Sequence, residues 1–205
     1  MTNNIKKIIS IDAGAKGSIA VIKIPEKINQ YYNDEGKFML TKFRIKEIKF
    51  YNIAKFDIKT RINKLRDFFE NETKEENLIF IENVHPNKIF GSKSSFTFGF
   101  SFARIITALE ILKLSPIKVK IGWRIKLIGY LKKNYPNIYS RIKNKIGTIP
   151  HNYDERKEAN TIIAKILMDY MYEEEVKYLY EYLNNHHNAD ALLIAISGLL
   201  FEISL

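Results

Sequence analysis

The chain has 205 residues, of which 46% are hydrophobic, and we expect residues 1–205 to form one domain around one core. It contains no cysteine, which excludes disulfides and thiolate metal sites and leaves Asp, Glu and His as candidate metal ligands. The formal net charge of +10 favours a polyanionic partner, although a chain rich in Lys, Ile and Asn owes part of that charge to codon bias. No run of eighteen apolar residues and no secretory leader is present, so we expect no membrane partner and a cytoplasmic location.

The first half of the sequence predicts three antiparallel strands, one helix and a fourth strand. "IKKIISIDAG" indicates a strand that ends at Asp12, "GSIAVIKI" its hairpin partner, and the alternating "FMLTKFRIKEIKF" a third strand. Apolar residues near helical spacing predict an amphipathic helix over 55–72. "NLIFIE" is almost continuously apolar, as in a strand covered on both faces, and it ends at Glu82.

The second half predicts helices around a fifth strand. A loop over 83–95 precedes an aromatic-rich helix over 96–114, the strand "PIKVKI" and the short helix "WRIKLIGYL". Residues 132–154 are expected to form an irregular basic excursion, followed by helical segments over 155–172, 173–183 and 187–203. The predicted fold class is therefore α/β, with a mixed five-stranded sheet of three antiparallel and then two parallel strands, flanked by helices.

The last helix carries charge where almost every other residue is aliphatic. His187 and Asp190 are three residues apart and share one side of a helix that is apolar round most of its circumference. Burying an ionised carboxylate is costly unless a cation meets it. The alternative is a purely structural role, in which Asp190 complements the helix dipole and Asn185 caps the helix.

Asp12 and Glu82 follow the first and fourth strands. If these strands are parallel neighbours, both carboxylates emerge side by side at the carboxyl edge, where the first turn of the last helix can join them. Such a set suits Mg²⁺ or Mn²⁺, and two ions would support phosphodiester hydrolysis. Taken singly, Asp12 can open a turn and Glu82 can be an exposed acid.

The loop before the aromatic helix carries candidate DNA contacts. Its lysines and serines suit phosphate binding, although an ordinary flexible loop is an equal alternative. We expect the aromatic stripe after it to be core or dimer interface rather than a base-stacking surface. The candidate DNA-binding residues are Lys88, Ser92, Lys93, Ser94 and Ser95, together with Arg124.

Several stretches in order resemble the RuvC-type Holliday junction resolvases of the RNase H-like superfamily, particularly their phage-borne members. They are "IISIDAGAKGSIAVI", "IFIENVH", "SSFTFGFSFARIITAL", "KIGWRIKLIG" and "HHNADALLIAI". The resemblance implies an RNase H-like fold, a homodimer that acts on four-way DNA junctions, and Mg²⁺ or Mn²⁺, with two ions per site. It assigns the metal-binding catalytic set to Asp12, Glu82, His187 and Asp190, and the catalytic basic residues to Lys126 and Lys157.

The sequence departs from this family at the junction point. The aromatic residue that wedges into the junction in some members falls at His85, so Phe90, Phe96 or Phe98 would have to replace it. Cleavage of flaps or replication forks and an inactive basic DNA-binding protein of the same fold remain alternatives. "DAGAKGS" also suggests an ATP-using kinase, but that fold needs a second similar domain and a glycine-rich adenosine motif.

Overall fold

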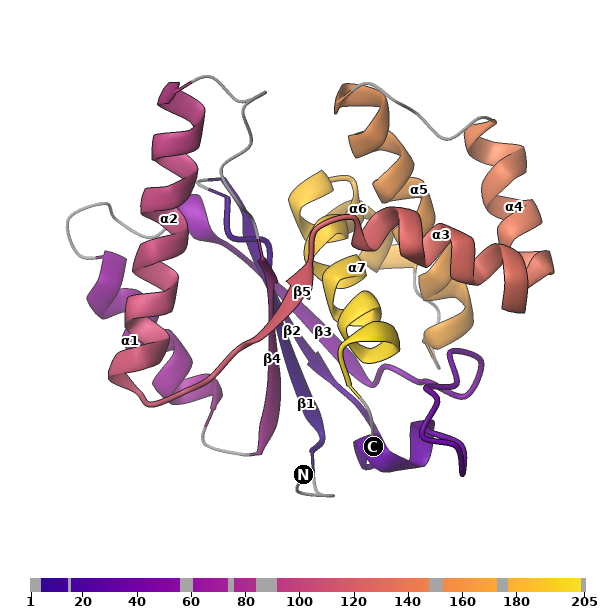
Figure 1. Cartoon of the computed structure of the whole chain (residues 1–205), viewed down its shortest axis with the longest axis horizontal. Coiled ribbons are helices and arrows are strands. Elements are labelled where there is room, and N and C mark those ends of the chain that lie inside the picture. Colours follow the sequence, from indigo (N-terminus) through magenta and orange to yellow (C-terminus); the bar gives the residue numbers. More distant parts are fainter. Residues whose placement is uncertain are drawn as a thin grey trace.

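A computed structural model describes residues 5–14, 16–55, 61–73, 76–83, 92–147, 153–172 and 177–203. These residues build a five-stranded sheet with helices on both faces (Figure 1). The strand order is β3-β2-β1-β4-β5, with β1–β2 and β2–β3 antiparallel and β1–β4 and β4–β5 parallel. This confirms the predicted mixed sheet. The strands are β1 (Lys7–Ile11), β2 (Ser18–Lys23), β3 (Glu47–Asn52), β4 (Asn77–Asn83) and β5 (Ile117–Lys120).

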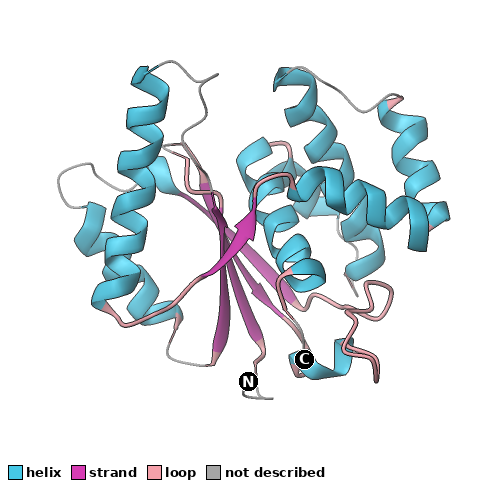
Figure 2. Cartoon of the chain, in the orientation of Figure 1, coloured by secondary structure: helices cyan, strands magenta, loops and turns pink. Residues whose placement is uncertain are grey.

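The helices divide between the two faces of the sheet (Figures 1 and 2). One face is covered by α1 (Arg61–Glu72) and α2 (Ser92–Ile111). The other carries α7 (His186–Phe201), which packs directly on β1, β2 and β4, with α3 (Trp123–Asn134), α4 (Pro136–Ile146), α5 (Tyr153–Met171) and α6 (Lys177–Leu183) around it. Two 3₁₀ turns span Ile28–Tyr31 and Ile53–Lys55.

Successive residues of the central strands β1 and β4 point to opposite faces of the sheet and pack into two separate hydrophobic cores. Ile8 and Phe80 belong to the large cluster beneath α7, whereas Ile9 and Ile11 belong to the cluster beneath α1 and α2. All four side chains are 0% exposed, so the central strands are buried on both faces of the sheet. This explains why these strands are continuous apolar runs in the sequence rather than alternating ones.

The third strand is shorter than the sequence predicts. Only Glu47–Asn52 pairs as β3, and the alternation over 38–46 reflects a loop whose apolar residues are buried. Phe38, Leu40 and Phe43 pack into the large core without forming a ladder with β2. The alternation of apolar and polar residues in this segment therefore comes from a packed loop and not from a strand.

The prediction of an irregular excursion over 132–154 is wrong for its central part. Residues 136–146 form α4, with Pro136 in the first turn, where its missing N–H costs nothing. Ile138 and Ile142, four residues apart, are both buried against the large core. Pro136 thus marks the start of α4 and the lysines of α4 mark its exposed face, while 148–152 lie outside the described residues.

The boundaries of α1 and α2 also differ from the prediction. α2 begins at Ser92, inside the expected loop, and ends at Ile111 rather than at 114. α1 begins at Arg61, and residues 56–60 of the helix expected over 55–72 lie outside the described part.

Within the described ranges, no helix is both long enough and apolar enough to cross a membrane.

Candidate active site

Asp12 and Glu82 lie side by side at the carboxyl edge of the sheet. The last paired residues of β1 and β4 before them are Ile11 and Ile81, which face each other in parallel register. Side chains alternate along a strand, so Asp12 and Glu82 share the face of Ser10 and Phe80. Ser10 Oγ donates to the Ala191 carbonyl of α7 at 2.6 Å, which shows that this is the face covered by α7.

A tight turn after β1 fixes the backbone of Asp12. The Asp12 N–H donates to the Ser18 carbonyl at 2.9 Å, and the Gly17 N–H to the Gly14 carbonyl at 2.9 Å. A Cβ at Gly17 would lie 1.9 Å from the Asp12 carbonyl oxygen, so only glycine fits there. The "DAGAKGS" stretch therefore builds a turn that presents the Asp12 carboxylate.

The first turn of α7 brings His187 onto Asp12. The Asn185 side chain accepts from the His187 N–H at 3.1 Å, which confirms Asn185 as the helix cap. His187 Nδ1 lies 2.6 Å from Asp12 Oδ2. An ionised carboxylate only accepts hydrogen bonds, so beside an ionised Asp12 the Nδ1 atom is the donor, and in the neutral form of the ring Nε2 would be the lone-pair nitrogen. His187 can therefore ligate a cation or accept a proton through Nε2.

Glu82 is held by the first residue of α3. Trp123 Nε1 donates to Glu82 Oε1 at 2.8 Å, and the indole ring itself is buried. Burial, and then the neighbouring Asp12 charge, raise the pKa of Glu82, against the lowering effect of the Trp123 hydrogen bond. Because the Asp12 charge raises the pKa of Glu82, the two carboxylates lie close enough to repel each other.

Asp190 meets a cation from α3 and an amide from α5. A terminal nitrogen of Arg124 lies 3.9 Å from Asp190 Oδ1, and the Asn160 amide donates to the same oxygen. Burial, and then the Asp12 charge, raise the pKa of Asp190 to about 7, although Arg124 and the Asn160 hydrogen bond oppose this shift. Asp190 thus lies on a mostly apolar helix, and Arg124 and Asn160 offset only part of the cost of burying its charge.

The donor chemistry of this cluster fits a hard divalent cation, but the side chains are not closed round one point. Asp12, Glu82 and Asp190 are oxygen donors of the kind that Mg²⁺ and Mn²⁺ prefer, and burial, followed by repulsion from Asp12, raises the pKa of Glu82 and of Asp190. Among the described residues, however, no three His, Asp or Glu side chains are grouped tightly enough to hold one ion as they stand. Binding would require these carboxylates to turn from their present protein partners.

The predicted basic residues occupy different positions relative to the cluster. Arg124, predicted to bind DNA, is the α3 residue that pairs with Asp190. Lys126 is exposed on α3, and Lys157 is half-buried on α5, one turn before Asn160.

The predicted loop contacts are only partly described. Lys88 lies outside the described residues, as do His85 and Phe90. Ser92, Lys93 and Ser94 lie in the first turn of α2, where only their backbone is described, and Ser95 is half-buried on the same helix. Phe96 is 74% exposed and Phe98 is half-buried.

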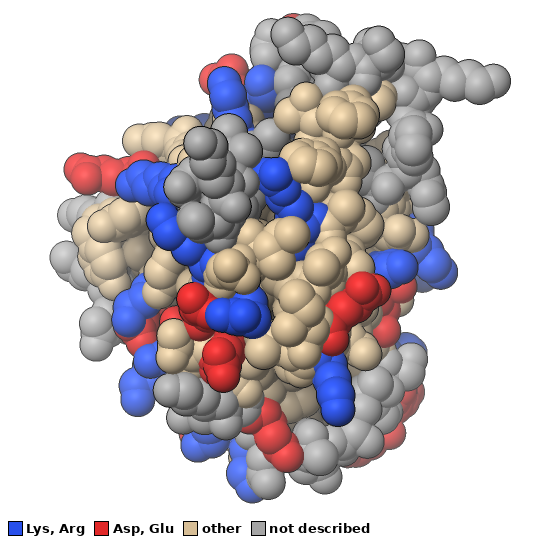
Figure 3. Space-filling model, turned by 90° about the vertical axis from the view of Figure 1, so that its left-hand side faces the viewer, with Lys and Arg blue, Asp and Glu red and all other residues tan. Residues whose placement is uncertain are grey.

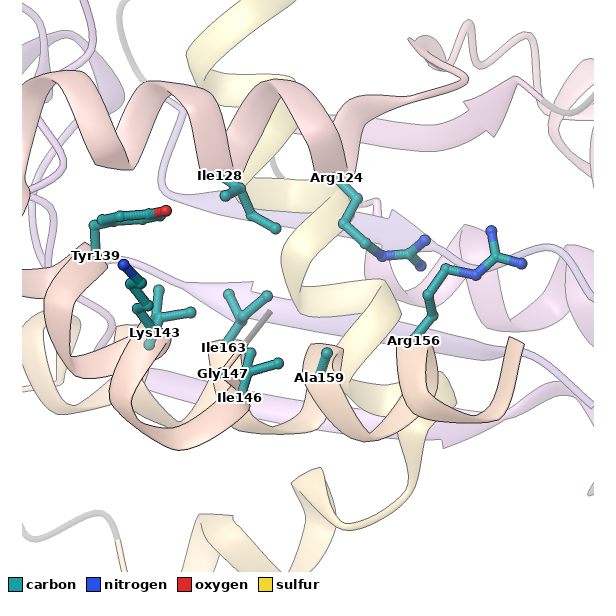
Figure 4. A pocket seen from close by; sticks show the side chains of 10 residues that line it. Arg124, Ile128, Tyr139, Lys143, Ile146, Gly147, Arg156, Ala159 and Ile163 are labelled. Carbon is teal, nitrogen blue, oxygen red and sulfur yellow. The ribbon is translucent and has the colours of Figure 1, made fainter. Parts of the chain in front are cut away.

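Arg124 also lines a pocket enclosed by α3, α4 and α5 (Figure 4). Arg124 and Arg156 extend towards the same end of this pocket, while Ile128 and Ile163 form apolar walls. Its empty volume is about 400 Å³, including the open mouth. Arg124 therefore connects this pocket to the cluster, because one of its terminal nitrogens lies 3.9 Å from Asp190 Oδ1.

Sequence reasoning missed Asn160 and the hydrogen bond of Trp123. Asn160 is 0% exposed, and its position gives a usable signal, because Asn160, Ile163, Ala164 and Leu167 form one buried stripe along α5. An amide on such a stripe needs hydrogen-bond partners. Nothing in the local sequence of Trp123 indicates that its indole N–H contacts the Glu82 carboxylate.

The fold and this edge define a class: an α/β protein with a mixed five-stranded sheet of order β3-β2-β1-β4-β5, and with a cluster of acids and one histidine at the carboxyl ends of β1 and β4. No protein-family model and no curated protein matches the chain. Among solved structures, it is similar to T. thermophilus RuvC in complex with Holliday junction substrate, with 10% identity, a TM-score of 0.48, and coverage of 96% of this chain and 94% of that one. A second Thermus thermophilus RuvC structure has 11% identity, a TM-score of 0.48, and coverage of 96% and 95%.

Proposed function

We propose that this protein is a metal-dependent endonuclease that resolves four-way DNA junctions by paired phosphodiester hydrolysis. The observation that carries the proposal is the carboxylate cluster at the sheet edge, in which burial and mutual repulsion raise the pKa of Glu82 and Asp190. Such shifts are typical of sites that bind or transform a ligand. The resemblance of the sequence motifs supplies the junction as substrate, and we place the protein in the cytoplasm of a bacterium or of a phage-infected cell.

The residues of the cluster have distinct roles in this proposal. Mg²⁺ or Mn²⁺, with two ions held by Asp12, Glu82, His187 and Asp190, would supply Lewis-acid stabilisation of the phosphodiester. Arg124, which has a terminal nitrogen 3.9 Å from Asp190 Oδ1, suits a contact with the scissile phosphate, because a guanidinium binds phosphate oxygens well. Lys126 and Lys157 remain proposed as further cationic groups. Hydrolysis adds water to phosphorus and releases the 3′ oxygen with a proton.

A substrate panel tests the proposed function. Purified protein is incubated with Mg²⁺ or Mn²⁺ and a labelled four-way junction, flap, fork or linear duplex of matched sequence. We expect two symmetric nicks in the junction and little cleavage of the linear duplex. Preferred cleavage of flaps or forks would assign the debranching activity instead, and binding without cleavage of any substrate would assign an inactive DNA-binding protein.

Junction affinity should fall steeply with salt. The chain has 33 Lys and Arg residues against 23 Asp and Glu residues, so phosphate contacts and counterion release should dominate binding. With about six phosphate contacts, we expect the dissociation constant to rise about 10³-fold between 50 and 200 mM salt. Titration of a labelled junction in EDTA measures this slope, and a flat dependence would contradict phosphate contacts as the main source of affinity.

We also propose that the protein acts as a homodimer through α2. One side of α2 packs on the sheet through Ile105 and Leu109, while Phe96, Phe100 and Ile111 are 74%, 50% and 54% exposed. Phe96 and Phe100 stack at 6.1 Å, and the Arg104 guanidinium lies 3.9 Å above the Phe100 ring. Figure 3 shows uncharged surface exposed on this side of the molecule. A second copy of α2 would cover these rings and place two active sites on one junction.

A charge on this α2 surface should break the dimer. We expect Phe100→Asp to shift the protein from dimer to monomer in analytical ultracentrifugation, because an interface carboxylate would be buried without a partner. The matched control is Tyr178→Asp, which changes a ring that is 55% exposed on α6, on the other face of the sheet. A wild-type protein that is monomeric at micromolar concentration would contradict the dimer.

A further inference from the structure

Asn160 joins the positive and negative sides of the candidate site. Its Oδ1 accepts from Arg124 Nε at 2.6 Å, and its Nδ2 donates to Asp190 Oδ1. Asn160 is 0% exposed, while the Arg124 and Asp190 side chains that it contacts are 26% and 20% exposed. Arg124 and Asp190, which come from α3 and α7, are therefore connected by one residue of α5.

The chemistry of the three groups fixes which way the amide points. A guanidinium has only donors and an ionised carboxylate has only acceptors, so the Asn160 oxygen must face Arg124 and its NH₂ must face Asp190. Leucine has neither function, aspartate has no donor, and glutamine is one methylene longer in a fully buried position. Asparagine is the residue that makes both bonds at this distance from α5 without adding a charge.

The link also sets how Arg124 approaches Asp190. Asn160 uses Nε of Arg124, while a terminal nitrogen of the same guanidinium lies 3.9 Å from Asp190 Oδ1, longer than a hydrogen bond. The guanidinium lies 5.0 Å over the Trp123 ring, which limits its rotation. Arg124 is thus held near Asp190 by an amide and a ring rather than by a tight ion pair.

We propose that Asn160 is a positioning residue that holds the Asp190 carboxylate for divalent-ion binding and holds Arg124 beside it for a substrate phosphate. This inference rests on the proposed function, in which Asp190 is a metal ligand. A direct Arg124–Asp190 pair would occupy the carboxylate and the guanidinium with each other. The neutral amide bridge orients both groups and adds no charge of its own to the site.

The test uses the full-length protein without DNA and has two readouts. The first is the Arg124 Nε–H signal in ¹H–¹⁵N NMR spectra, identified by its absence in Arg124→Ala. We expect slow solvent exchange of this proton in the wild type and its loss in Asn160→Leu, because the buried acceptor is removed. The second is Mn²⁺ affinity by isothermal titration calorimetry, which we expect to fall about 10-fold in Asn160→Leu, as for other residues that orient metal ligands.

Two further variants keep the test decisive. Asn160→Ala, which is smaller, replaces Asn160→Leu if thermal melting shows that leucine prevents folding. Thr161→Val is the matched control on α5, because it removes the hydrogen bond from Thr161 to the Lys157 carbonyl and touches neither Arg124 nor Asp190. We expect wild-type Mn²⁺ affinity and an unchanged Arg124 signal in this control.

Each outcome separates the inference from the proposed function. A folded Asn160 variant with the wild-type Arg124 signal or with wild-type Mn²⁺ affinity would overturn the positioning role, even if the wild type cleaves junctions. A wild type that shows the protected Arg124 signal but neither binds Mn²⁺ nor cleaves DNA would overturn the proposed function and the positioning of a metal ligand. In that case the Arg124–Asn160 contact alone would stand.

Discussion

Asp190→Asn should lower the rate of junction cleavage by at least about 10³-fold, equivalent to about 4 kcal/mol of transition-state stabilisation. The substitution removes one negative charge from the proposed metal site and retains an oxygen that can accept from the Asn160 amide. Asp12→Asn should have a comparable effect, because the Asp12 charge acts on both Glu82 and Asp190. Single-turnover cleavage of a labelled junction measures both rates.

The same variants should still bind the junction. Affinity in EDTA or Ca²⁺ should stay within about threefold of wild type, because phosphate contacts with Lys and Arg dominate it. The matched control is Asp67→Asn, which makes the same chemical change on an exposed side chain of α1 that pairs with its neighbour Arg66. Wild-type cleavage by both Asp12→Asn and Asp190→Asn would show that the cluster is not the active site.

The pH dependence of the free energy of unfolding provides an independent check on the raised pKa of Asp190. Asp190 has a pKa of about 7 in the folded protein and an ordinary value of 3.8, so between these values the folded state binds more protons than the unfolded state. Its contribution to stability is therefore lost as pH rises towards 7. Without divalent ions, Asp190→Asn should be more stable than wild type by about 2–4 kcal/mol at pH 8, and by much less at pH 4. Thermal melting at the two pH values measures the difference.

Gly198→Ala should destabilise the protein by about 3 kcal/mol or more, a lowering of Tm by about 6–12 °C in a chain of this size. A Cβ at Gly198 would lie 2.4 Å from Cδ1 and 2.5 Å from Cε1 of Phe80. Phe80 is 0% exposed at the centre of β4, so its ring has no solvent to move into. The close approach of α7 to the sheet, which also places His187 and Asp190, depends on this glycine.

A second glycine provides the control for this prediction. Gly129 lies inside α3, and a Cβ there would meet no atom within 4 Å. Gly129→Ala should therefore leave stability unchanged or raise it by up to about 1 kcal/mol, through helix propensity alone. Phe80→Leu in the Gly198→Ala background should recover part of the loss. A Gly198→Ala protein with wild-type Tm would show that α7 can move away from β4 at little cost.

Much of the fold could be predicted because each central element carries its own pattern. The apolar runs before Asp12 and Glu82 are typical of strands covered on both faces, and the structure buries them beneath helices on each side. The last helix is aliphatic round most of its circumference, and α7 is buried accordingly. The segments 38–46 and 136–146 were mispredicted because a packed loop can alternate like a strand, and because proline and lysine mark helix starts and exposed helix faces as well as irregular structure.

Residue type and strand parity, both readable from the chain, predict that Asp12 and Glu82 share one face of the sheet. Asp12 directly follows β1 and Glu82 is the penultimate residue of β4, so the parallel pairing of these strands brings the two side chains to the same edge. The groups that surround them become visible only once the helices have packed on the sheet. Trp123 reaches Glu82, and Asn160 joins Arg124 to Asp190, across 41, 36 and 30 residues of chain. These contacts depend on how α3, α5 and α7 pack against one another, and helix packing is set by the whole core rather than by the local sequence of any one helix.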